Sequence, residues 1–378
     1  ATAAASASIS ASGDLTASGA GTVLATSGSS CSADVIRDAS ATCTAISASS
    51  CASAQRFAAS ATCTATSGSS ASADAIRTAS ATVAATSSAS ASAIKLIDGS
   101  ATIAATSSSS VSAEEVLAAS ATSLATSGAS SSANVIRDAS ATVTATSGGI
   151  VKSDSIIDAS ATVLAVATGS VDAEADYTAS ATVEAVSTGS ASAEIQVYTA
   201  GSATVVATSA GTCSAVETKS SSATSVALAI LSVTPEATRN GAATIIATSG
   251  GSAKTDGIKN AAATIQATSA GTVDAEADYV GSATVIAVSG GSVDATMEQA
   301  GSATVLAVSS GTASGVIQTY QQGSATVLAV SDGSAIGVKD EAGSATVIAT
   351  SAGTVTPEVT RNCAATIVAV SGGSVKTS

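Results

Sequence analysis

The cysteines are the residues whose type and spacing most suggest chemistry. Cys31 and Cys51 lie 20 residues apart in the sequence, and so do Cys43 and Cys63. If the chain repeats with that period, each pair occupies one column in adjacent turns, with Cα atoms roughly 5 Å apart, inside the range that a disulfide bridges. Two disulfides and two reduced thiol ladders both fit this spacing. Reduced or mixed thiols are favoured, because the other two cysteines have no evident partner.

Metal binding and catalysis find little support in the sequence. The chain has no histidine, no C-x-x-C pattern and no glycine-rich phosphate loop. Segments 171–177 and 273–279 each carry three carboxylates, which we interpret as solvated acidic surface, since the glycine-rich calcium-binding nonapeptide is missing. Nucleophilic catalysis needs a base beside Ser or Cys, yet Ser, Asp and Glu here belong to repeating columns. We therefore expect no catalytic residue, no metal and no cofactor, and predict that the protein is not an enzyme.

The elements that would position these residues form a repeat. A threonine in the context [Ser/Ala/Gly]-[Ala/Gly]-Thr recurs at a step of 20 residues, lengthened twice to 22 at the corners 198–201 and 320–323. Self-similarity at such a period is typical of solenoids. The repeat threonines are Thr2, Thr22, Thr42, Thr62, Thr82, Thr102, Thr122, Thr142, Thr162, Thr182, Thr204, Thr224, Thr244, Thr264, Thr284, Thr304, Thr326, Thr346 and Thr366.

Each repeat predicts two short strands joined by turns. In 140–147 the side chains alternate with a period of two, which is typical of a strand. Ala141, Val143 and Ala145 form the set expected inside, and the residue three beyond the repeat threonine is Ala in every unit, which indicates a tightly packed interior. Turns such as 289–292, rich in Ser and Gly, are expected to place glycine at positive φ. Acids on the solvent side of the second strand are Asp34, Asp74, Glu114, Glu174, Glu276 and Glu358.

These patterns predict an all-β fold. We expect a single elongated β-solenoid of about nineteen coils, with 20 residues and two short strands per coil. Residues 1–378 would form one continuous repeat domain, about 90 Å long at about 4.8 Å per coil, with a Thr-rich outer face in about 1–160 and a more apolar one in about 161–378. Helices are disfavoured, because no apolar stripe has a period of 3.6. Disorder is the alternative, given the Ser and Gly content.

The net charge limits the partners. The chain has 27 acidic and 13 basic residues, for a net charge of −14. Nucleic acid is disfavoured as a partner, because a phosphate-binding surface needs clustered Lys and Arg. No apolar run reaches the roughly 18 residues that span a bilayer, so membrane insertion is not expected.

The outer face of the first strand becomes more apolar towards the C-terminus. Contiguous exposed apolar side chains usually mark an interface, so we predict a homo-oligomer, such as a trimeric shaft, joined along this face; the alternative is that a thin coil leaves Val and Ile partly exposed without a partner. The residues predicted to form the oligomer face are Ile286, Val288, Leu306, Val308, Leu328, Val330, Val368 and Val370.

Runs such as Gly-Ser-Ala-Thr-Val-Leu-Ala-Val-Ser-Ser-Gly in 301–311 resemble the repeats of bacteriophage tail-fibre shafts, other virion appendages and bacterial surface fibres. The resemblance extends over nearly the whole chain and is one of composition and period. It implies a structural fibre or spacer, often oligomeric, at a virion surface or outside the cell, which contacts itself and other structural proteins of its assembly and supports host attachment. A bacterial surface adhesin or filament subunit is an alternative of the same kind.

Ice binding is an alternative of a different class. Thr-x-Thr on a flat solenoid face is how some antifreeze proteins order water, and this pattern occurs at 42–44, 62–64 and 142–144. In most other repeats the second Thr is replaced, even by Glu184. The broken array disfavours ice binding relative to a fibre.

Overall fold

The structure is a computed structural model, and its strands fall into two compact units, Ala1–Thr188 and Gly189–Ser378, which are described separately. It describes residues 2–7, 10–17, 21–37, 41–57, 60–77, 80–97, 100–117, 120–137, 140–157, 160–177, 180–197, 202–219, 222–239, 241–259, 262–279, 281–299, 302–319, 324–340, 344–360 and 364–376. The insertion corners at 198–201 and 320–323 lie outside these residues.

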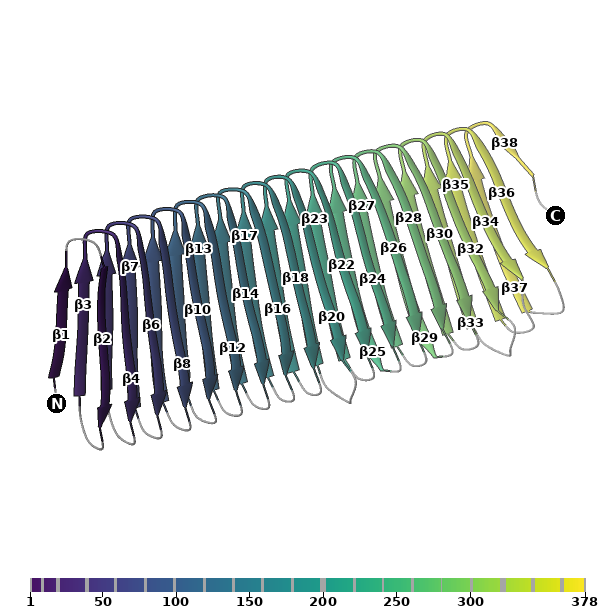
Figure 1. Cartoon of the computed structure of the whole chain (residues 1–378). Helices are drawn as coiled ribbons and strands as arrows, with labels where there is room; N and C mark the ends of the chain where they lie inside the picture. The colour runs from purple at the N-terminus through teal and green to yellow at the C-terminus, as the bar shows by residue number, and fades with distance from the viewer. Residues whose placement is uncertain are drawn as a thin grey trace. The chain divides into compact units, whose positions relative to one another are not determined.

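In the first unit, odd-numbered strands build one parallel sheet, sheet A, and even-numbered strands build a second, sheet B (Figure 1). The strands of sheet A are β1 Thr2–Ala7, β3 Gly21–Ser27, β5 Ala41–Ser47, β7 Ser60–Ser67, β9 Ser80–Ser87, β11 Ala101–Ser107, β13 Ser120–Ser127, β15 Ser140–Ser147, β17 Ser160–Ala167 and β19 Ser180–Ser187. Those of sheet B are β2 Ser10–Ala17, β4 Ser30–Arg37, β6 Ser50–Phe57, β8 Ser70–Arg77, β10 Ser90–Ile97, β12 Ser110–Leu117, β14 Ser130–Arg137, β16 Ile150–Ile157 and β18 Ser170–Tyr177.

The second unit repeats this arrangement, and we use the same sheet names for its odd and even strands. Its sheet A contains β21 Ser202–Ser209, β23 Ser222–Ala229, β25 Ala242–Ser249, β27 Ala262–Ser269, β29 Ser282–Ser289, β31 Ser302–Ser309, β33 Ser324–Ser331, β35 Ser344–Ser351 and β37 Ala364–Ser371. Its sheet B contains β20 Ser190–Val197, β22 Thr212–Lys219, β24 Ser232–Arg239, β26 Ser252–Lys259, β28 Thr272–Tyr279, β30 Ser292–Gln299, β32 Thr312–Thr319, β34 Ser334–Asp340, β36 Thr354–Thr360 and β38 Ser374–Val375.

Strands of successive turns pair in parallel and in register. Thr142 pairs with Thr162, and Ala145 pairs with Ala165, so each residue lies over its equivalent in the next turn. The backbone of one turn is therefore satisfied by the turns on either side. The predicted fold class is confirmed: the chain is a parallel β-solenoid with about 20 residues and two strands per turn. One continuous domain over 1–378 stays a prediction.

The core is a thin layer of small side chains. The predicted inner set Ala141, Val143 and Ala145 is buried. The alanine three residues beyond the repeat threonine is buried in every sheet A strand from β3 to β35, and Val, Ile, Cys or Ser fills the inner position before it. Small residues are required because the neighbouring turn places an identical side chain about 4.8 Å away.

Serine hydroxyls donate hydrogen bonds to backbone carbonyls at the turns between the two sheets. The last inner residue of most sheet A strands is a buried serine. In some strands its hydroxyl donates to the carbonyl three residues ahead, as in Ser107 to Ser110 at 2.6 Å and Ser269 to Thr272 at 2.8 Å. In others it donates to the preceding turn, as in Ser289 to the Gly271 carbonyl at 2.6 Å. These bonds to backbone carbonyls favour Ser at a position that is otherwise apolar.

The turns require glycine because neighbouring turns pack closely, and not because the backbone adopts a left-handed conformation. The expectation of positive φ is wrong for Gly290 and Gly291, since neither lies in the left-handed region. The Gly291 N–H donates to the Gly271 carbonyl at 3.0 Å, and a Cβ at 291 would lie 2.4 Å from that same oxygen. Glycine suits this turn because the backbone of the preceding turn lies so close.

Candidate functional site

The two cysteine pairs lie where the repeat places them. Cys31 on β4 pairs with Cys51 on β6, and Cys43 on β5 pairs with Cys63 on β7. All four are buried free thiols, as is Cys213. Their register would bring Cα atoms to about 4.8 Å, which is compatible with a disulfide.

Burial makes Cys51 and Cys213 poor nucleophiles. It raises the pKa of Cys51 to about 12 and the pKa of Cys213 to about 11. Cys43 and Cys63, the pair with no exposed surface, share a hydrogen bond. This bond lowers the pKa of Cys43 and raises the pKa of Cys63. Thiols that stay protonated at neutral pH react slowly, because the thiolate is the reactive species. Cys363 lies outside the described residues.

The predicted acidic positions lie on the outer side of sheet B, as the alternation indicates. In β28, Asp274 and Glu276 are exposed and Asp278 is half-buried. Partial burial, followed by the repulsion of Asp256 on the adjacent strand, raises the pKa of Glu276. Within the described residues, no group of three or more His, Cys, Asp or Glu side chains is arranged to hold a metal ion.

The predicted oligomer face lies on the outer side of sheet A in Gly189–Ser378. One column of this face holds Ile286, Leu306, Leu328 and Val368, and the neighbouring column holds Val288, Val308, Val330 and Val370. From β29 to β33 most of these side chains are half-buried, because two adjacent apolar columns cover each other. The exposed fraction is largest at Val370, at 55%.

Threonines form two columns on the outer side of sheet A in Ala1–Thr188, within the part of the chain whose outer face is predicted to be Thr-rich. In each strand from β7 to β15 the repeat threonine is followed four residues later by a second outward threonine, as in Thr62 and Thr66 or Thr102 and Thr106. The Thr-x-Thr motif overlooks this spacing. Counting outward positions two at a time along each strand places both columns on the outer face.

In Gly189–Ser378 the repeat threonines line a groove of about 750 Å³ that crosses the strands from β21 to β33. Serines and alanines of the same strand ends complete its lining. The groove therefore presents hydroxyl groups at the spacing of the turns.

Sheet B also encloses charged residues that sequence reasoning missed. Lys95 on β10 and Glu115 on β12 are register partners, and both are fully buried. Gln55 lies in the same inner column, and its side-chain amide donates to the Thr62 carbonyl. The signal was present, because alternation from the buried Ala91 and Ala93 places residue 95 inside.

A comparison of the chain with known protein families, with curated proteins and with solved structures gave no match. In the described part of the chain, no helix has the length and apolar character needed to cross a bilayer.

Proposed function

We propose that the protein is a structural element, the shaft or spacer of an extracellular or virion-associated appendage. The observation that carries this proposal is the constant cross-section of each unit. Equivalent residues stack in register from turn to turn, and each turn hydrogen-bonds the next. In a solenoid built in this way, each added turn extends the molecule along the stacking axis, and the hydrogen bonds between turns make it stiff. A spacer requires both properties. The resemblance of its repeats to tail-fibre shafts favours the same role.

Such a shaft would associate with itself through the oligomer face of sheet A. The two apolar columns of that face extend over β29, β31 and β33 without a charged residue. Burying them against a second copy would remove apolar surface from water at about 25 cal/mol per Å². Other structural proteins of the same assembly would bind elsewhere on the solenoid.

Sedimentation of the purified full chain tests this role. We expect a homo-oligomer, and we expect Leu306→Asp to dissociate it, because a carboxylate in the middle of the face would be desolvated in the contact. Gln266→Asp is the matched control, since Gln266 is an exposed residue of the same column on β27. A chain that sediments as a monomer, or an oligomer that tolerates Leu306→Asp, would contradict the oligomeric shaft.

Ice binding is a second candidate, favoured by the paired threonine columns of β7 to β15. Two parallel ranks of hydroxyl and methyl groups, repeated at about 4.8 Å, would order water over one face. If this face binds ice, the chain should show thermal hysteresis, and Thr86→Tyr with Thr106→Tyr should abolish it without unfolding the sheet. A purified chain without hysteresis would remove this candidate.

A further inference from the structure

Sheet B of Ala1–Thr188 exposes an apolar column on its outer side. In the five adjacent sheet B strands from β8 to β16, the penultimate residue of each strand points outward and is aliphatic. These residues, which we call the sheet B stripe, are Ile76, Leu96, Val116, Ile136 and Ile156. Four of them have 45% to 53% of their surface exposed, and Val116 is half-buried. A contiguous apolar column this open to water is unusual for a surface that has no partner.

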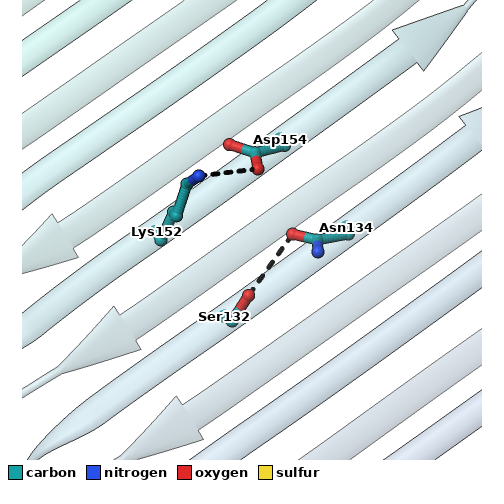
Figure 2. Close-up of polar contacts among 4 residues, drawn as sticks. All are labelled: Ser132, Asn134, Lys152 and Asp154. Carbon is teal, nitrogen blue, oxygen red and sulfur yellow. Dashed lines mark hydrogen bonds and ion pairs between the residues drawn. The ribbon is translucent and has the colours of Figure 1, made fainter.

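The neighbouring outward column of the same strands is mainly acidic. Two residues before the stripe, β8, β12 and β16 carry Asp74, Glu114 and Asp154, β14 carries Asn134, and β10 carries the exposed Ile94. Figure 2 shows this column on β14 and β16, where Asn134 accepts a hydrogen bond from Ser132 and Asp154 lies 3.3 Å from the Lys152 ammonium. Partial burial raises the pKa of Asp74. Asp154 already has a cationic neighbour in Lys152, so Asp74 and Glu114 are the carboxylates that a cation on a partner would stabilise most.

The narrow width of the stripe determines which kind of partner can cover it. It is one residue wide except at β10, where Ile94 lies beside Leu96. On β8, β12 and β16 the acidic column begins only about 7 Å away, two residues along the strand. A flat sheet laid on the stripe would cover the carboxylates as well and would desolvate them at high cost. A second copy of the chain fits poorly for the same reason, since its net charge is −14. An α-helix touches along a narrow line and leaves its flanks free to reach the acids.

We propose that the sheet B stripe docks an amphipathic helix of a partner protein, with lysines or arginines on the flank that faces Asp74, Glu114 and Asp154. Four steps of about 4.8 Å give a contact line of about 19 Å, which corresponds to about 13 helical residues. The aliphatic side chains supply the contact, and the acidic column fixes the orientation of the helix and speeds its association.

The test uses the full chain and a synthetic helical peptide of about 15 residues, with leucines on one face and lysines along one flank. Fluorescence anisotropy should detect binding that weakens with salt, and an otherwise identical peptide with glutamates on that flank should bind at least about tenfold more weakly. Ile136→Ser should weaken binding about tenfold. The matched control Leu124→Ser, at an exposed position of sheet A in the same unit, should leave it unchanged.

Equal binding of the two peptides, absence of binding, or equal effects of Ile136→Ser and Leu124→Ser would overturn the proposal. Self-association of the chain that Ile136→Ser abolishes would also overturn it, because the occupant would then be a second copy. Ile76→Ser provides an independent stripe variant should Ile136→Ser fail to give the strand-rich circular dichroism of the parent. Failure of the shaft proposal appears separately, in the response of sedimentation to Leu306→Asp.

Discussion

Replacement of Ala165 by leucine is expected to destabilise the Ala1–Thr188 unit by about 3 kcal/mol. Ala165 is fully buried on β17, and its register partners on β15 and β19 are Ala145 and Ala185. The larger side chain would have to enter a layer in which identical methyl groups are stacked about 4.8 Å apart. The strands cannot separate to admit it without losing ladder hydrogen bonds, so the packing strain is not relieved.

Chemical unfolding followed by circular dichroism, with hydrogen exchange of 160–177, measures this effect. The matched control is Thr162→Leu, which adds a leucine to an exposed outward position of the same strand. We expect the control to lie within about 0.5 kcal/mol of the parent chain. If both variants unfold alike, the alanine column does not set the packing limit of the core.

The second large effect concerns the buried charges of sheet B. Glu115→Ala should destabilise the same unit by about 3 to 5 kcal/mol, because it leaves the Lys95 ammonium in the core without the opposite charge of its register partner. The double variant Lys95→Met with Glu115→Leu should regain most of this loss, since apolar residues of similar volume replace both charges. The free energy of unfolding of each variant is the measurement.

Glu114→Ala is the control for this pair, because Glu114 is the exposed neighbour on the opposite side of β12. If Glu114→Ala lowered the free energy of unfolding as much as Glu115→Ala, the loss would come from removing an acidic residue in general and not from the buried charge. A double variant no more stable than Glu115→Ala would show that the site requires polar groups.

The period of 20 residues made the fold predictable. Once the repeat threonines were aligned, alternation within each strand indicated that Ala145 faces inwards and Glu276 outwards, and register pairing placed the cysteines in adjacent turns. These inferences needed no long-range information, because contacts in a solenoid join residues of the same turn or of neighbouring turns.

The same reasoning was weaker where the chemistry of a residue conflicted with its position. Glu114 and Glu115 are adjacent and alike, yet one is exposed and the other is buried. Composition suggests that both are solvated, and only the count along the strand separates them. Composition also did not separate the two kinds of apolar surface: the apolar columns of β29 to β33 shield each other, whereas the column of Ile76 and Ile136 lies beside a mainly polar column and is more exposed.

Register pairing between neighbouring turns has an evolutionary consequence. Duplicating or deleting a whole turn leaves every remaining inward residue inward, whereas shifting a strand by a single residue would exchange its two faces. Unequal recombination between repeats can therefore change the number of turns without disturbing the fold. The number of turns is thus a trait that selection can adjust in steps, independently of the residues that each turn displays.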